Sequence, residues 1–115
     1  MPGIEKLIAY RKACLLYLKL HPVVARFPQN ERFTLGQRIE NSMGLIIELI
    51  VRANMVKGDR IEFFKRISLE LDLLLTWVKI AKDLQFMGVN QYGYICTKQN
   101  EIAKMCTVWL KDKSM

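Results

Sequence analysis

The stretch that decides the fold is residues 26–54, RFPQNERFTLGQRIENSMGLIIELIVRAN. A preceding helix cannot run on through it, because Pro28 pushes the residue before it out of helical geometry. Two starts are then open for the helix that follows. Asn30 has a side chain suited to an N-cap. Thr34 has Gln37 three residues later, which is the spacing of a capping box.

The second half of this stretch has the apolar period of an amphipathic helix. Polar residues fall on one side of a helical wheel, and the other side carries Leu35, Ile39, Met43, Ile46, Ile50 and Ala53. The pattern predicts a helix of about six turns that ends near Asn54 to Lys57. Gly36 and Gly44 inside it each cost about 1 kcal/mol against alanine. At Gly36 we expect the close approach of a neighbouring helix.

Three further helical patterns complete the chain, over Gly3–Leu20, Asp59–Phe86 and from Asn90 to the C-terminal tail. The first is expected to stop before Pro22 and to pack through Ile4, Leu7, Cys14, Leu15 and Leu18. Gly88 is expected to close the third. Four amphipathic helices with short connections predict an all-α, antiparallel up-and-down four-helix bundle. At 115 residues, 1–115 form one domain.

The helix over 59–86 carries two apolar arcs instead of one. The first arc contains Phe64, Ile67, Leu71, Leu74, Leu75 and Val78. The second arc contains Leu69, Leu73, Trp77, Ile80 and Leu84. Two apolar arcs require burial on two sides. The second arc is therefore either the flank of the bundle core or a contact with another subunit.

The net charge is +7, from 18 basic and 11 acidic residues. This excess suits a polyanion such as RNA or DNA, although an ordinary basic protein has the same balance. The candidate contacts are Arg52, Lys57, Arg60, Lys65, Arg66, Lys79 and Lys82. A ring of subunits would repeat these scattered charges into a continuous surface. No aromatic residues interleave them along the sequence, so we expect phosphate or shape recognition.

No motif for catalysis, metal binding or cofactor binding is present. The single histidine, His21, precedes a proline, and a phosphate-binding glycine loop is missing. Cys14, Cys96 and Cys106 lack metal-ligand spacing, and reduced thiols suit the cytoplasm. No apolar run reaches the length of a membrane span. We therefore expect a non-enzymatic protein without a cofactor.

Two charged residues in apolar surroundings suggest a structural pair. Arg38 borders the core side of its helix, and Asp72 lies in the middle of the next long helix. A buried charge needs a partner. We expect either an Arg38–Asp72 pair that fixes the register of the two helices, or solvation of both side chains.

Two runs carry a family resemblance: FPQNERFTLGQRIEN at 27–41 and LELDLLLTWVKIAKDL at 69–84. They resemble the four-helix bundle proteins related to the accessory variability determinant (Avd) of diversity-generating retroelements. Close relatives of these proteins are encoded by intervening sequences inside 23S ribosomal RNA genes. The resemblance extends over about Tyr17 to Leu110 and implies the same four-helix fold.

The resemblance also implies a function. Avd proteins form homopentameric barrels with a positive surface, and they bind nucleic acid and a reverse transcriptase during mutagenic homing. Lys79 matches a basic position implicated in these contacts. Two positions depart from the family pattern. Thr76 stands where the family often has arginine, and Thr107-Val108 replaces a glycine pair before Trp109. The alternative is a structural or protein-interaction bundle of the intervening-sequence type, with no nucleic-acid role.

Overall fold

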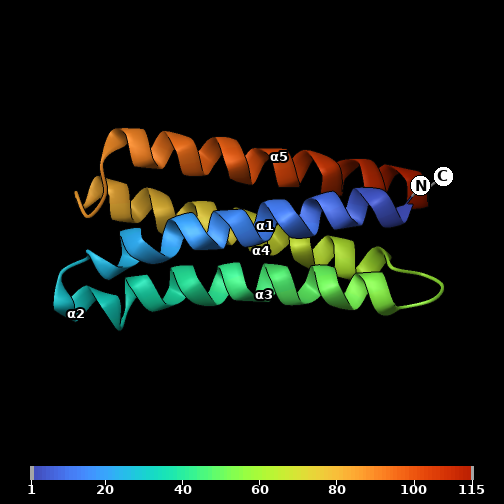
Figure 1. Ribbon diagram of the computed structural model, residues 1–115, viewed down its shortest axis with the longest axis horizontal. Coiled ribbons are helices and arrows are strands. Elements are labelled where there is room, and N and C mark those ends of the chain that lie inside the picture. The colour runs from blue at the N-terminus through green and yellow to red at the C-terminus, as the bar shows by residue number, and fades with distance from the viewer. Residues whose placement is uncertain (1, 115) are drawn as a thin grey trace.

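The computed structural model describes the backbone of residues 2–114 and the side chains of residues 7–111. Within that part of the chain, all regular secondary structure is helical, and the predicted all-α four-helix bundle is confirmed. The molecule measures 44 × 23 × 20 Å. The helices are α1 (Pro2–Ala25), α2 (Gln29–Arg32), α3 (Leu35–Met55), α4 (Ile61–Asp83) and α5 (Val89–Ser114) (Figure 1).

The long helices form a closed square in which α1 and α4 occupy opposite corners. Both α3 and α5 pack against α1 and against α4. In Figure 1, α1 lies nearest the viewer with α4 behind it. Both chain ends lie at the same end of the bundle as the connection between α3 and α4. The outward faces of α1 and α4 therefore point in opposite directions.

The core is built mainly from the faces that the sequence predicted for α3 and α4. All six predicted apolar residues of α3 are buried. On α4, five of the six residues in the first arc are buried, and Leu75 is half-buried. Ile95, Ile102, Cys106 and Trp109 close the core from α5. Burial raises the pKa of the Cys106 thiol to about 11.

The expected end of the first helix at Pro22 was wrong, because α1 continues through this residue to Ala25. A proline inside a helix removes the hydrogen bond to the carbonyl four residues earlier. Here that carbonyl belongs to Leu18, which is exposed, as is Pro22. Water can therefore take the place of the missing donor.

The predicted packing face of α1 was also wrong. The buried residues of this helix are Ala9, Ala13, Leu16, Leu20 and Val24. Leu15 and Leu18, which were expected in the core, are 62% and 67% exposed, and Ile4 lies outside the described side chains. α1 is apolar on almost every side, so its period could not select a face. The small side chains of Ala9 and Ala13 instead allow α1 to lie close to its neighbours.

At the start of α3, the structure chooses between the two open possibilities. Thr34 occupies the N-cap position, while Gln29–Arg32 forms the separate short helix α2. The predicted capping box is not formed, because the Thr34 hydroxyl donates to Glu31 and the Gln37 amide donates to Asn41. Gly36 follows in the first turn of α3 and is buried. A Cβ atom added there would lie 2.8 Å from Val24 Cγ1 and 3.3 Å from the Glu31 carbonyl oxygen. The structure thus shows a close approach of the chain at Gly36.

The end of α4 differs from the prediction that Gly88 closes this helix. The helix ends at Asp83, and Gln85 adopts the left-handed conformation with φ of 66°. The Gln85 N–H donates to the Lys82 carbonyl and the Phe86 N–H donates to the Ala81 carbonyl, both at 2.9 Å. These two bonds define a Schellman motif. Its left-handed position usually holds glycine, so glutamine hid the helix end from sequence analysis.

The expected Arg38–Asp72 pair is not formed. The Arg38 guanidinium lies over the Trp77 ring, 5.1 Å from its centroid. Asp72 is exposed. Asp72 and Trp77 are separated by about 140° around α4, given 3.6 residues per turn. Trp77 lies on the flank of α4 that faces α3, whereas Asp72 points away from Arg38.

Candidate nucleic-acid interface

Five of the predicted basic residues gather around the connection between α3 and α4. Three of them already have partners. Arg52 Nη2 lies 2.8 Å from Glu48 Oε1, and Lys65 Nζ lies 3.6 Å from Glu62 Oε1. The Arg60 Nε donates to the Val56 carbonyl at 2.8 Å.

Lys57 and Arg66 complete this group. Both are exposed, and among the described residues neither has an acidic partner within ion-pair distance. Within this group of five, Lys57 and Arg66 are the two side chains that form neither an ion pair nor a hydrogen bond with the described residues. Arg60 likewise has no carboxylate partner, because the Val56 carbonyl that it binds is uncharged.

The other two predicted residues, Lys79 and Lys82, lie near the end of α4. Both ammonium groups bind Asp83, at 2.8 Å for Lys79 and 3.5 Å for Lys82. The hydrogen bond between Lys79 and Asp83 raises the pKa of the lysine and lowers the pKa of the aspartate. Lys82 also lies over the Tyr92 ring, 5.2 Å from its centroid. This group contributes a net charge of only +1.

The predicted basic residues thus form two groups and not one patch. Lys65 and Lys79 are separated by roughly 21 Å along α4, at 1.5 Å per residue. This distance is more than twice the Debye length of about 8 Å at physiological salt. Within one subunit, the two groups act on a polyanion independently.

A third basic region, which the sequence prediction missed, lies where α1 meets α5. Lys19 Nζ lies 5.6 Å and Lys98 Nζ lies 5.5 Å from the centroid of the Tyr94 ring. Lys19 and Lys98 are far apart in the sequence, so a search for charges interleaved with aromatic residues along the chain passed over them. The spacing of Tyr94 and Lys98, one helical turn apart, was the available signal.

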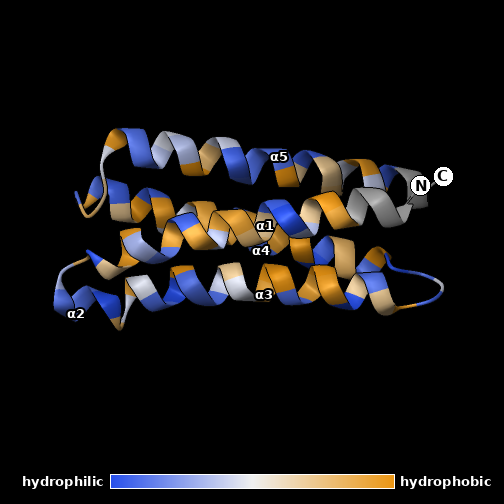
Figure 2. Cartoon of the chain, viewed as in Figure 1, coloured by the Kyte–Doolittle hydropathy of each residue, from blue (hydrophilic) through white to orange (hydrophobic). Residues whose placement is uncertain are grey.

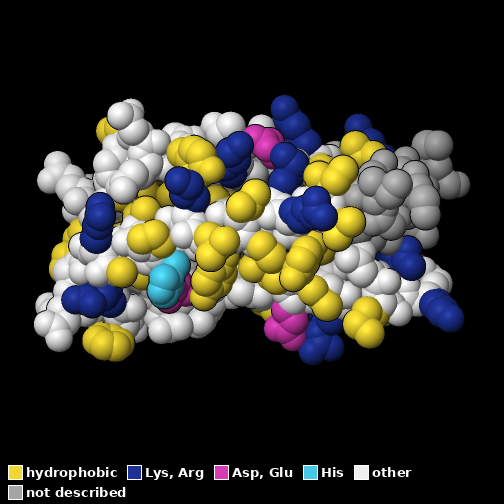
Figure 3. Space-filling view, viewed as in Figure 1, with side chains coloured by type: hydrophobic (Ala, Val, Ile, Leu, Met, Phe, Trp, Pro, Cys, Tyr) yellow, Lys and Arg dark blue, Asp and Glu magenta, His cyan; other side chains and the backbone are white. Residues whose placement is uncertain are grey.

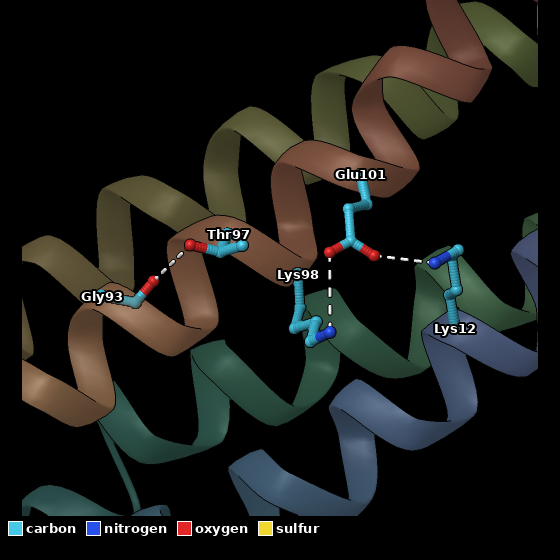
Figure 4. A network of polar contacts seen from close by, with 5 residues as sticks. All are labelled: Lys12, Gly93, Thr97, Lys98 and Glu101. Carbon is cyan, nitrogen blue, oxygen red and sulfur yellow. Dashed lines mark hydrogen bonds and ion pairs between the residues drawn. The ribbon is translucent and has the colours of Figure 1, made fainter.

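An ion-pair network holds this region in place. Glu101 Oε1 lies 2.7 Å from Lys12 Nζ of α1, and Glu101 Oε2 lies 3.5 Å from Lys98 Nζ (Figure 4). The hydrogen bond from Lys12 lowers the pKa of Glu101, and the Lys98 charge acts in the same direction. The close-up also shows the Thr97 hydroxyl donating to the Gly93 carbonyl at 3.0 Å. The 3.5 Å contact with Glu101 keeps the Lys98 ammonium group near Tyr94 and leaves the side chain free to move.

A hollow of about 400 Å³ lies beside Tyr94 in the groove between α1 and α5. Its apolar surface comes from Pro22, Val23 and Ile95, and Lys19 and Arg26 add positive charge. Among the described residues, no acidic side chain lines this hollow. It is therefore suited to a ligand with an apolar or aromatic body and a negative group.

Two apolar surfaces remain uncovered on one subunit. We call Leu69, Leu73, Trp77, Ile80 and Leu84 the α4 arc, and Leu7, Ile8, Leu15 and Leu18 the α1 face. In the α4 arc, Leu69 is 57% exposed, and Leu73 and Trp77 are half-buried. All four residues of the α1 face are exposed. Figure 2 shows apolar residues along α1, and Figure 3 shows hydrophobic side chains on the face of the molecule where α1 lies nearest the viewer (Figure 1). The two surfaces lie at opposite corners of the bundle.

The described residues contain no group of three or more histidine, cysteine, aspartate or glutamate side chains placed to hold a metal ion. His21 binds Glu40 of α3 through Nδ1. Among the described helices, none combines the length and the apolar content that crossing a bilayer requires.

A family model described as bAvd-like matches residues 7–113 of the chain. This match spans all four long helices, including every predicted basic residue and both apolar surfaces. No curated protein is similar to the chain at a significant level.

Proposed function

Because the chain belongs to the bAvd-like family, a family of accessory proteins, we propose that it binds nucleic acid as a closed ring of identical subunits. Its partner in this role is a retroelement reverse transcriptase, as the resemblance to Avd implies. The protein contributes charge and shape, and the transcriptase performs the chemistry. A ring of about five subunits is the size that the same resemblance implies, and it is a closed cyclic symmetry.

The observation that carries this proposal is the placement of the α1 face and the α4 arc. Two different apolar surfaces at opposite corners favour a head-to-tail contact, in which one surface of each subunit meets the other surface of the next. One side of the bundle, about 44 Å long and 20 Å wide, offers an area close to the roughly 800 Å² per partner of a stable interface.

Assembly into a ring would also strengthen the attraction for a polyanion, which is weak for a single subunit. The two predicted basic groups are too far apart to reinforce each other within a subunit, and several of their members are paired with carboxylates. A ring repeats each group around its axis. The uncompensated charges of Lys57 and Arg66 would then recur at regular intervals along a bound phosphate backbone.

Salt-titrated binding to generic RNA and duplex DNA, combined with light scattering, tests the proposal. We expect binding to weaken steeply with salt. We also expect a mass of about five chains, the ring size named above. The double variant Lys57→Gln/Arg66→Gln should bind more weakly, with a salt slope lower by about 0.9 for each lost duplex contact. Lys104→Gln, an exposed lysine of α5 outside the predicted set, is the matched control. A monomer that binds neither polymer at low salt would contradict the proposal.

A second candidate is a protein-interaction bundle without a nucleic-acid role, of the intervening-sequence type. The exposed leucines of the α4 arc favour it, because another protein could cover them as well as a second copy could. The same titration separates the two candidates. A stable ring that fails to bind RNA or DNA at about 50 mM salt would support the interaction bundle.

A further inference from the structure

We propose that Tyr94, flanked by Lys19 and Lys98, is a stacking site for an unpaired base of single-stranded nucleic acid. This inference rests on the proposed function and deepens it, because it names the form of the ligand and the side chain that recognises it. It assigns a role to a region outside the predicted basic residues.

The Tyr94 ring is accessible and has two lysine ammonium groups close to it. It is 42% exposed. The ammonium groups of Lys19, from α1, and Lys98, from α5, lie at similar distances from its centroid, 5.6 and 5.5 Å. Lysine side chains are flexible, so a base can replace one ammonium group over the ring while that group moves to a neighbouring phosphate. This exchange is favourable because base–aromatic stacking is stronger than an exposed cation–π contact.

The neighbouring hollow has the chemistry that the rest of a nucleotide requires. Its apolar surface, formed by Pro22, Val23 and Ile95, can cover the sugar of the stacked nucleotide. Arg26 provides a second cation on the same side of the bundle as Lys19. A strand that runs along the groove between α1 and α5 would thus meet an aromatic ring, an apolar surface and the charges of Lys19 and Arg26. Lys98 adds a charge that Glu101 partly compensates.

This arrangement favours a single strand over a duplex. In a duplex the faces of the bases are stacked on one another and are closed to a tyrosine ring, whereas the bases of a single strand are open. Among the described residues, the ring that lies beside a lysine of the two basic groups, Tyr92 next to Lys82, is half-buried and less open than Tyr94. Those groups suit phosphates of either form.

The test measures fluorescence anisotropy with three labelled probes: an unpaired oligonucleotide of about 12 residues, a spacer of equal length that has phosphates but no bases, and a duplex. Tyr94→Ala should weaken binding of the unpaired probe by roughly 5- to 150-fold, the range expected for one stacked base. Its binding to the abasic and duplex probes should not change. Unpaired RNA and unpaired DNA are run in parallel, and both should respond.

Two variants serve as controls. Tyr94→Phe keeps the ring and should bind as the wild type does. Tyr10→Ala removes an exposed tyrosine from the flank of α1 that faces α3, and should leave binding to all three probes unchanged.

A further variant tests the phosphate contact. Lys98→Gln should weaken binding to the abasic probe as well as to the unpaired probe, and should lower the salt slope by about 0.7.

The outcomes separate the inference from the function on which it rests. If the wild type binds nucleic acid and Tyr94→Ala binds the unpaired probe equally well, the stacking site is overturned and the proposed function stands. An equal loss on the abasic probe would also overturn stacking. If the wild type binds none of the probes, the proposed function and this inference both fail.

Discussion

The guanidinium of Arg38 on α3 lies over the indole ring of Trp77 on α4, 5.1 Å from the ring centroid. This contact joins α3 to the α4 arc, of which Trp77 is a member. Because Arg38 is exposed, the contact should be worth about 0.5–1 kcal/mol. In a double-mutant cycle with Arg38→Ala and Trp77→Leu, urea unfolding should give a coupling energy of that size.

Asp72→Ala is the control for this cycle. Asp72 points away from Arg38, so its removal should change the free energy of unfolding by less than about 0.5 kcal/mol, as is usual for surface substitutions. Combination with Arg38→Ala should be additive. A coupling between Arg38 and Asp72 as large as the one with Trp77 would show that the two charges interact after all.

Gly36→Ala should destabilise the bundle. The added methyl group would lie 2.8 Å from Val24 Cγ1, and valine is stiff at χ1, so the end of α1 must move. We expect a loss of about 1 kcal/mol in the free energy of unfolding, at the low end of the cost of overpacking. Gly44 of the same helix has no atom within 4 Å of such a methyl group. Gly44→Ala should therefore gain up to about 1 kcal/mol from helix propensity. Equal effects of the two substitutions would refute the packing role of Gly36.

Gln85→Gly should stabilise the protein. Gln85 has φ of 66° in the Schellman motif that ends α4, and a left-handed conformation costs a residue with a Cβ atom about 1 kcal/mol. We expect the free energy of unfolding to rise by up to about 1 kcal/mol, which appears as a higher urea midpoint at an unchanged slope. Gln85→Ala keeps the Cβ atom and should bring no such gain. A lower midpoint for Gln85→Gly would mean that the glutamine side chain itself holds the turn.

The sequence predicted the buried face of a helix correctly where the apolar residues of that helix fall on one side only. In α3, one apolar side faces a polar side, and all the predicted core residues are buried. In α1, the buried face carries Leu16 and Leu20 as well as Ala9 and Ala13, while Leu15 and Leu18 lie outside. Because leucines stand on both sides of this helix, the apolar pattern could not show which side is buried.

The candidate site was only partly accessible to sequence analysis. Charges on neighbouring turns of α4 could be grouped from their spacing, but the partners that compensate them, such as Asp83, matter as much as their number. The environment of Tyr94 depends on α1 and α5 lying side by side. A contact between residues 19 and 94 follows from tertiary structure alone.

The ion pair between Lys12 and Glu101 should make stability depend on pH. Because the pKa of Glu101 is lowered in the folded state, its contribution is present above the ordinary glutamate pKa and is lost as the pH falls through the folded-state value. Glu101→Gln should therefore lower Tm at about pH 7, and the difference from the wild type should vanish near pH 3. Glu62→Gln, which removes the looser 3.6 Å contact with Lys65, should have a smaller effect. A pH-independent difference for Glu101→Gln would assign its effect to packing.

A mixing experiment tests whether the α1 face meets the α4 arc of the next subunit. Leu18→Glu and Leu69→Glu each place a charge on an exposed position of one surface, so each variant should remain helical but dissociate to monomers in light scattering. An equal mixture should form heterodimers, because the intact α4 arc of Leu18→Glu can bind the intact α1 face of Leu69→Glu. The heterodimer cannot grow further, because the two surfaces that it leaves free are the mutated ones. Asn100→Glu, on an exposed position of α5, should keep the wild-type mass. If each surface instead bound its own copy, each variant alone would form dimers through its intact surface. Failure of the mixture to pair would then exclude the head-to-tail contact.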